Sequence, residues 1–344
     1  MARIKEEELK AQIKSGEFSN VYFIYGEETY LKEHYVKKLK DKLVDPAFED
    51  FNFHQYEGRD SALSDILQDA DMIPMMSEHS MVLVHDFPFD KQSDIDDIKE
   101  FFKDVPDSSV LVFWYDSISV DFKKQKKWTG IEKAFASAGS SVELSKKTEG
   151  ELAKLIMAYA KKRKCTIDSA TARYLIAVVG NDLKTIFNEL EKLCSYVPES
   201  EITKKDIDSV AVKCLSARVY DLSKFITKGD SDNAYKVLNT LFEQKEDPIE
   251  ISSVISSCYI DMYRAKCVNS ANVPPSDLKE YFNYRNRDFV INNAVRDSRN
   301  ISFSNLRDAI DILAQSDEKL KSTAIDKRLV LEEAVAKLLC LREM

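Results

Sequence analysis

The sequence predicts an α/β domain that is followed by helices alone. Strand-like apolar runs alternate with helical periodicity up to about residue 146, no strand pattern follows residue 147, and no glycine follows Gly229. A long stretch without glycine is hard to fold as a turn-rich sheet and is typical of helices packed on helices. We therefore expect three domains, at residues 1–146, 147–213 and 214–344.

The first domain is expected to contain a parallel sheet that is covered on both faces. Its strand-like runs are apolar almost throughout, which is typical of parallel strands buried on both faces. Between the runs, apolar residues recur at helical spacing over residues 30–43, 63–70 and 95–102. Strands that alternate with helices favour this architecture. The predicted strands are Val21–Tyr25, Phe51–Tyr56, Met81–His85, Val110–Tyr115 and Val142–Leu144.

Residues 147–213 are expected to form a small helical domain. Asp168 and Asp182 each precede an apolar-periodic run, where an aspartate caps the first turn of a helix. Thr203 with Asp206 has the spacing of a capping pair for one further helix.

The third domain, residues 214–344, is expected to consist of helices only. Pro248 stands near a predicted helix start, and the Pro274–Ser276 segment separates two helices. The chain ends in an amphipathic helix predicted over residues 324–341. A block of this size has more apolar helix surface than a small domain needs, so we expect it to mediate oligomerisation.

Composition excludes several classes of protein. Of 344 residues, 44% are hydrophobic and 32% are charged, as in soluble globular proteins. The longest apolar runs have strand length, well short of the roughly 20 residues that span a membrane, and the N-terminus has no secretory pattern. Six scattered cysteines without a C-x-x-C pair predict free thiols in a reducing cytoplasm and no metal site. The net charge of −9 argues against a domain devoted to nucleic acid.

The stretch GEETYLKE (Gly26–Glu33) follows the first predicted strand and has the frame of a phosphate-binding loop, G-x-x-x-x-G-K-[ST]. Gly26 and Lys32 stand at the spacing of the first glycine and the lysine. Leu31 replaces the second glycine, and Glu33 replaces the hydroxyl that holds Mg²⁺. The frame therefore predicts a degenerate nucleotide loop, with no bound cofactor and no catalytic residue.

A working ATPase of this kind also needs an acidic pair after a later buried strand. Asp116 follows the strand predicted over Val110–Tyr115, but Ser117 stands where the second carboxylate is needed. The degenerate loop and the missing second carboxylate therefore both argue against ATP hydrolysis. An active ATPase stays as the alternative from the enzyme class, since Lys32 and Asp116 favour it. The loop taken alone is also compatible with an unrelated strand–turn–helix.

The most basic segment of the chain contains four lysines: Lys123, Lys124, Lys126 and Lys127. Lysines beside an aromatic residue, here Trp128, can bind a nucleic-acid backbone. The chain would then be a DNA-binding adaptor that contacts DNA through these lysines. A solvated loop after the fourth predicted strand is the other interpretation.

Four apolar residues, Ile73, Pro74, Met75 and Met76, lie in a connection between a predicted helix and a predicted strand. A short polar turn is expected at such a place. The segment is either tucked against the core or exposed as an anchor for a partner. Methionine suits an anchor, because its flexible and polarizable side chain adapts to a hydrophobic pocket.

Four stretches together resemble the delta subunit of the bacterial DNA polymerase III clamp loader. They are VYFIYGEETYLKEH, IPMMSEHSMVLVHDF, VGNDLKTIFNELEKL and DLSKFITKGDSDNAYKVLNTLFEQKEDPIEI, and they occur in the order of that family. The resemblance implies a RecA-like AAA+-type parallel-sheet domain, a small helical lid and a C-terminal helical collar. It also implies a non-catalytic subunit in the cytoplasm, since family members leave ATP hydrolysis to neighbouring subunits.

The same resemblance implies partners and a contact site. Members of the family bind the ring-shaped sliding clamp and open it for loading onto primed DNA during replication. They join the ATPase and delta-prime-like subunits through the collar. The clamp-contacting pair of the family falls on Met75 and Met76, where the family commonly has Leu-Phe. The segment Ile73–Met76 is therefore the expected clamp-binding site.

Overall fold

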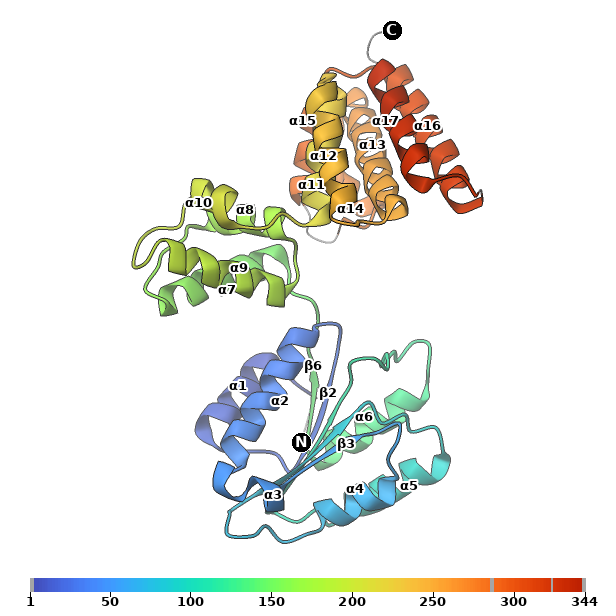
Figure 1. The fold of residues 1–344 in the computed structure, drawn as a ribbon. Helices are drawn as coiled ribbons and strands as arrows, with labels where there is room; N and C mark the ends of the chain where they lie inside the picture. The colour runs from blue at the N-terminus through green and yellow to red at the C-terminus, as the bar shows by residue number, and fades with distance from the viewer. Residues whose placement is uncertain (1–2, 285–287, 323, 342–344) are drawn as a thin grey trace. The chain divides into compact units, whose positions relative to one another are not determined.

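The computed structural model describes residues 3–284, 288–322 and 324–341 (Figure 1). Its internal contacts divide the chain into two compact units, Met1–Lys147 and Thr148–Met344. Across the described ranges, no helix has both the length and the apolar character that crossing a membrane requires.

The first unit is built on a six-stranded sheet in the order β1-β6-β2-β5-β4-β3, in which every neighbouring pair is parallel. The parallel sheet expected from the sequence is thus confirmed. The sequence did not predict β1, because a two-residue strand has no periodicity to detect. The strands are β1 (Arg3–Ile4), β2 (Val21–Tyr25), β3 (Phe53–Glu57), β4 (Ser80–His85), β5 (Ser109–Trp114) and β6 (Ser140–Glu143).

Helices cover both faces of this sheet. Figure 1 shows α1 and α2 on one side of the strands and α4, α5 and α6 on the other. Alternate residues of β2, among them Phe23, pack with Ile66, Trp128 and Phe135 in the core beneath the second group. The helices of this unit are α1 (Glu6–Ser15), α2 (Thr29–Leu43), α3 (Glu49–Asn52), α4 (Leu63–Ala70), α5 (Gln92–Phe101) and α6 (Lys127–Ala138).

One strand prediction was partly wrong. Phe51 and Asn52 were expected in a strand, but they form the end of α3, and β3 begins at Phe53. The alternation of FNFHQY is compatible with a strand throughout. The short 3-10 turn at Pro46–Phe48 runs directly into α3 and carries helical backbone as far as Asn52.

In the described residues of the second unit, the secondary-structure elements are helices joined by loops, and an isolated bridge pairs Thr166 with Glu201. The predicted caps are confirmed: the carboxylates of Asp168 and Asp182 accept hydrogen bonds from the N–H groups of Thr171 (2.6 Å) and Thr185 (2.8 Å). Thr203 and Asp206 form the predicted capping box. The helices up to residue 213 are α7 (Glu149–Lys162), α8 (Ser169–Val179), α9 (Leu183–Tyr196) and α10 (Lys204–Val210).

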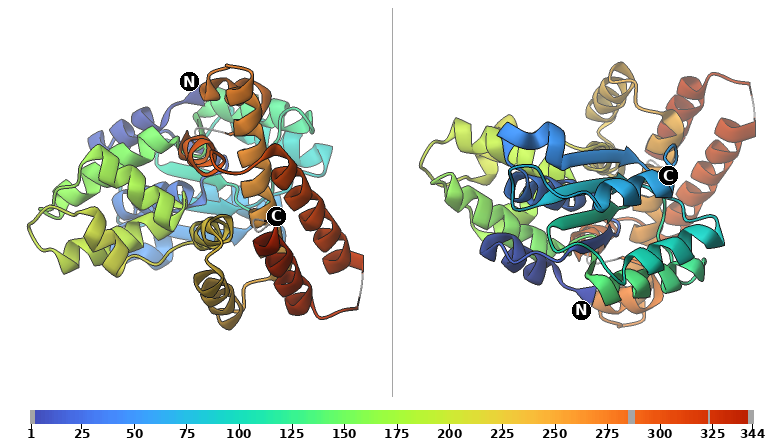
Figure 2. Two further views of the ribbon diagram at one scale, coloured as in Figure 1. Left: turned by 90° about the horizontal axis from the view of Figure 1, so that it is seen from above. Right: turned by 90° about the horizontal axis from the view of Figure 1, so that it is seen from below.

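The helices from residue 214 onward share a core of their own, in which Leu238, Ile255, Leu313 and Val335 are buried. Helix α13 packs on both α11 and α16, and α16 and α17 lie side by side (Figure 2). The helices are α11 (Leu215–Lys228), α12 (Ser231–Glu243), α13 (Pro248–Ser270), α14 (Leu278–Tyr281), α15 (Asp288–Asp297), α16 (Phe303–Ser322) and α17 (Lys327–Cys340). The assignment of 147–213 as a lid and 214–344 as a collar stays a prediction.

Candidate functional site

The degenerate nucleotide loop lies at the carboxyl edge of the sheet, after β2, and it is short. Helix α2 begins at Thr29, three residues after Gly26. Gly26 has a φ of 124°, and a Cβ atom there would lie 2.3 Å from the Leu144 carbonyl oxygen. The N–H group of Glu28 donates to that same carbonyl (2.9 Å). The loop therefore packs against the end of β6, and its backbone does not form a wide cradle for phosphate.

Lys32, which stands at the position of the phosphate-binding lysine, is 1% exposed. Its ammonium group donates to the carbonyl oxygens of Gly26 (2.9 Å) and Tyr115 (2.7 Å) and pairs with Asp116 (3.1 Å). A lysine ammonium has three hydrogens to donate, and these three acceptors account for them. The lysine thus fastens the end of β5 to the start of α2.

Asp116 has a second carboxylate beside it, which the sequence analysis missed. Asp86 follows β4, and its carboxylate accepts hydrogen bonds from the N–H groups of Asp116 (2.9 Å) and Ser117 (2.9 Å) and from the Ser117 hydroxyl. The expectation that no second carboxylate stands here was therefore wrong. Because β4 and β5 are neighbours in a parallel sheet, their carboxyl ends meet.

Both carboxylates are held ionised by contacts inside the protein. Burial would raise the pKa of Asp116, but the hydrogen bond from Thr29 (2.6 Å) and the charge of Lys32 outweigh it and hold the pKa below its ordinary value. Burial likewise opposes ionisation of Asp86, and the donors from Ser117, Asp116 and Ile118 outweigh it, so its pKa is lowered as well. The two carboxylates are thus engaged by Lys32 and by nearby N–H and hydroxyl groups, which leaves them little capacity to bind a cation.

The remaining loop residues lie differently from what the motif suggests. Leu31 is buried, whereas Glu33 is exposed. Within the loop, Glu28, the residue before α2, is 1% exposed and pairs with Lys146 (3.3 Å). A buried carboxylate at a helix N-terminus occupies the place that favours an anion. The described residues contain no group of three or more His, Cys, Asp or Glu side chains placed to hold a metal ion.

The basic segment offers fewer free groups than its sequence suggests. The Lys127 ammonium donates to the Pro88 carbonyl (2.8 Å) and to Asp90 (2.8 Å). Trp128 is fully buried, so it cannot stack on a base as an adjacent aromatic was expected to do. Lys123, Lys124 and Lys126 remain exposed.

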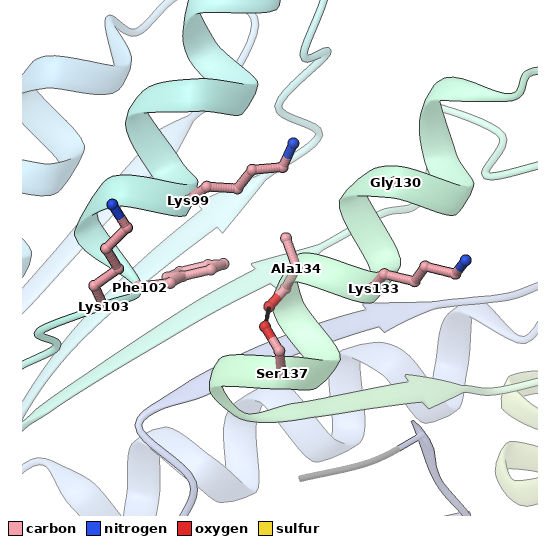
Figure 3. Close-up of a pocket in the computed structure, with 7 residues that line it drawn as sticks. All are labelled: Lys99, Phe102, Lys103, Gly130, Lys133, Ala134 and Ser137. Atoms are coloured by element: carbon pink, nitrogen blue, oxygen red, sulfur yellow. Dashed lines mark hydrogen bonds between the residues drawn. The ribbon is translucent and has the colours of Figure 1, made fainter.

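Three further lysines gather at a groove between α5 and α6 that the sequence did not reveal (Figure 3). The groove has a volume of about 380 Å³, and Phe102 forms part of its wall. Lys103, in the turn directly after α5, pairs with Glu100 on that helix, which offsets part of the positive charge. The lining residues are Lys99, Phe102, Lys103, Gly130, Lys133, Ala134 and Ser137.

The apolar segment between α4 and β4 lies at the opposite, amino edge of the sheet and is exposed. Ile73 is 91% exposed, Met76 78% and Met75 51%, and Pro74 is half-buried. Met72, which the sequence analysis did not single out, is 53% exposed. We call residues 72–76 the anchor segment. Its exposure contradicts the interpretation in which it is tucked against the core.

Contacts from α3 hold the anchor segment in place. The side chain of Asn52 exchanges two hydrogen bonds with the backbone of Met75 and donates a third to Ser77. Phe51, the preceding residue, is 60% exposed. Neither residue stood out in the sequence, because the alternation of FNFHQY predicts a strand, where alternate side chains point to opposite faces.

Comparison with known proteins identifies the family of the chain. The family model described as DNA polymerase III, delta subunit, matches residues 22–142, and the one described as DNA polymerase III delta subunit, C-terminal domain, matches residues 216–338. A model described as a middle domain matches residues 148–209.

Relatives of similar length give the same result. The chain is 26% identical to DNA polymerase III subunit delta of Bacillus subtilis over 336 residues, which is 95% of each chain. It is 22% identical to the probable DNA polymerase III subunit delta of Aquifex aeolicus over 258 residues, covering 72% of this chain and 70% of the relative.

A solved structure shows the same fold. The Bacillus subtilis DNA clamp loader delta protein matches with a TM-score of 0.60 at 24% identity, over 97% of this chain and 99% of that one. With two models of one family matching its N-terminal and C-terminal parts and a relative aligned along nearly its whole length, the chain belongs to the family of DNA polymerase III delta subunits.

Proposed function

We propose that this chain is the non-catalytic clamp-loader subunit that binds the sliding clamp through residues 73–76 and helps to open it for loading onto primed DNA. The observation that carries the proposal is the anchor segment, in which four apolar side chains are exposed on one fixed connection. Exposed apolar groups that gather in one place mark an interaction site. Exposing these apolar side chains to water costs free energy, and a partner pocket that buries them would recover it.

The energy available from such a contact is sufficient for specific binding. Fully burying one methionine side chain is worth about 1.5–3 kcal/mol, and a few anchors of this kind often dominate an interface. Ile73, Met75 and Met76 together therefore supply several kilocalories per mole before the cost of association.

The carboxyl edge supports a role without ATP hydrolysis. The ammonium group of Lys32 donates to three acceptors within the protein, and Glu28 places a buried negative charge at the start of α2. An active ATPase would need that lysine and the helix N-terminus free for phosphate. We therefore propose that the chain works by binding and leaves hydrolysis to other subunits.

The test replaces both Met75 and Met76 with aspartate in the full chain. Two carboxylates would enter an apolar pocket unpaired, so affinity for the sliding clamp of the same organism should fall at least a hundredfold, or about 2.7 kcal/mol. The melting temperature should barely move, because both side chains are exposed. Surface plasmon resonance and calorimetry measure the two quantities.

The matched control is Met157→Asp, which changes an exposed methionine on α7, in the second unit. It should leave clamp affinity at the parental value. If the double aspartate variant melts normally and still binds the clamp as tightly as the parent, the proposed function is wrong. A melting temperature many degrees lower would show instead that the pair contributes to the core.

We further propose that residues 214–344 join the chain to the other loader subunits. A fragment of residues 1–213, which ends before Cys214, keeps the whole sheet, the anchor segment and helices α7–α10. It should still bind the clamp within about threefold of the full chain and should no longer co-elute with the other subunits in gel filtration. A fragment that still enters the complex would show that the collar is not the joining part.

We propose that three of the four lysines of the basic segment can contact primed DNA. Lys123 and Lys126 are exposed and can approach a phosphate backbone in the assembled loader, and Lys124 is exposed beside Asp121 (3.8 Å), whereas Lys127 is engaged within its own unit. An independent DNA-binding adaptor would have to bind primed DNA alone, with strong salt dependence.

A further inference from the structure

Asn52 is a fully buried polar residue whose side chain serves the anchor segment and its neighbour. Its amide nitrogen donates to the Met75 carbonyl oxygen (2.8 Å) and to the Ser77 hydroxyl (3.0 Å), and its amide oxygen accepts from the Met75 N–H group (2.7 Å). An asparagine amide has two donor hydrogens and one acceptor oxygen. Both hydrogens and the oxygen are directed at this one connection.

The three bonds bracket an unfavourable backbone conformation. Met76 has a φ of 55°, in the left-handed region that residues with a side chain seldom adopt. The bonds of Asn52 reach Met75 on one side of it and Ser77 on the other. With these flanking residues fixed, the chain turns at Met76 and leaves the Ile73 and Met76 side chains 91% and 78% exposed.

The residue that supplies these bonds is itself firmly placed. Asn52 is the last residue of α3 and directly precedes β3. Lys40 of α2 pairs with Glu49 at the start of α3 (2.7 Å), and its ammonium lies 3.9 Å from the centre of the Phe53 ring. The hold on the anchor segment therefore comes from a short helix that is tied on both sides to the body of the domain.

We propose that Asn52 is a positioning residue that holds the anchor segment in its clamp-binding conformation before the clamp arrives. This inference rests on the proposed function of that segment. A loop that is already ordered loses less conformational entropy on binding, and only the fraction of molecules with the competent loop conformation contributes to affinity. Asn52 touches no partner in this account and acts through Met75, Met76 and Ser77.

The test is Asn52→Ala in the full chain. Affinity for the purified sliding clamp should fall about tenfold, as expected if the competent loop conformation becomes populated roughly a tenth of the time. In the free protein, hydrogen exchange at the Met75 amide should become faster, because that N–H group loses its acceptor. Combining Asn52→Ala with the Met75 and Met76 aspartates should reduce affinity no further than the aspartates alone.

The matched control is Asn20→Ala. Asn20 also directly precedes a strand, and its two amide hydrogens are shared among the carbonyls of Pro106 (3.0 Å), Asp107 (3.0 Å) and Ser109 (3.2 Å), so it fastens a different connection at the same edge of the sheet. Its replacement should lower the melting temperature to a similar degree and leave clamp affinity unchanged. If Asn52→Ala does not fold, Ser77→Ala removes one of the three bonds from the surface side and should weaken clamp binding roughly threefold.

The outcomes separate this inference from the proposed function. If the aspartate variant loses clamp binding but Asn52→Ala binds like the parent, the positioning role is wrong and the function stands. An equal loss of affinity in Asn20→Ala would show a general effect of stability and would also overturn the positioning role. If the parent does not bind the clamp, or the aspartates have no effect on binding, the proposed function falls and the inference falls with it.

Discussion

The two edges of the sheet in the first unit differ in how they use polar and apolar groups. At the carboxyl edge, where parallel sheets usually bind ligands, Lys32, Asp86 and Asp116 are occupied with one another and with nearby backbone. At the amino edge, the anchor segment leaves apolar side chains in water and uses one buried amide to hold its backbone. The polar groups at the carboxyl edge are therefore bonded within the protein, whereas the apolar groups at the amino edge are accessible to a partner.

This difference indicates what each edge contributes. The charges at the carboxyl edge should stabilise the domain, since Lys32 and Asp86 are buried and hydrogen-bonded and the more exposed Asp116 pairs with Lys32. The anchor segment contributes little to folding, because its side chains are largely solvated. Substitutions at the first edge should therefore change stability, and substitutions at the second should change binding.

The largest effect on stability is expected for Lys32→Met. The change keeps a similar side-chain length but leaves the carbonyls of Gly26 and Tyr115 without a donor and Asp116 without its cation. We expect the free energy of unfolding to fall by about 3 kcal/mol, measured by urea denaturation. Clamp affinity at a temperature where the variant is folded should match that of the parent.

Two results would contradict this prediction. Unchanged stability would mean that the buried ammonium contributes nothing net to folding. A loss of clamp affinity in a folded variant would show that the two edges are coupled, and the comparison between them would fail.

A smaller effect is expected on acidification. Glu6 follows β1 at the carboxyl edge; burial raises its pKa, but hydrogen bonds from Lys10, Lys147 and Tyr35 outweigh burial and lower the pKa to about 2 from 4.5. A lowered folded-state pKa stabilises the protein above the unfolded value, and the benefit is lost as pH falls through the folded value. Glu6 should therefore contribute its full stabilisation above pH 4.5, and about 3 kcal/mol of it should be lost as the pH falls toward 2.

Glu6→Gln is the control for this carboxylate. It should be less stable than the parent at pH 7 and should lose less stability on acidification, as followed by urea denaturation across the pH range. Asp86 and Asp116, whose pKa values are also lowered, should supply the remaining acid sensitivity. An acid response of Glu6→Gln as large as that of the parent would show that Glu6 is not among the responsible groups.

The smallest effect is expected from an attempt to restore the nucleotide loop. In Leu31→Gly with Glu33→Thr, Lys32 would still be held by its three acceptors and Glu28 would still be buried at the start of α2. Calorimetry with ATP and Mg²⁺ should show no binding at millimolar nucleotide, for the variant as for the parent. A micromolar dissociation constant in either protein would show that the carboxyl edge is not closed.

The sequence predicted the parallel sheet and the helix caps because these depend on local patterns. Buried strands such as Val21–Tyr25 are apolar throughout, and Asp168 and Asp182 cap helices through bonds to residues three positions on. The exposed anchor segment was identified as one of two interpretations, and packing was needed to choose between them.

Contacts between residues far apart in the sequence could not be predicted, because they depend on strand order and on the positions of side chains in the folded domain. Asp86 meets Asp116 only because β4 and β5 are neighbours, and Asn52 meets Met75 although the two are 23 positions apart in the sequence. Trp128 looked like a partner for the adjacent lysines, yet its ring is in the core. The role of a polar residue thus depended on contacts that no local spacing records.

Strand β3 ends the sheet on one side, and that position has a consequence for solubility and assembly. An edge strand presents unpaired backbone groups that can template pairing with another chain. β3 is five residues long and carries His54, Gln55 and Glu57, and at the opposite edge β1 has only two residues. Short and polar edges resist strand addition, so association that extends the sheet is disfavoured. Subunits that join this protein should do so through helices and loops, and concentrated preparations should resist growth into β-aggregates.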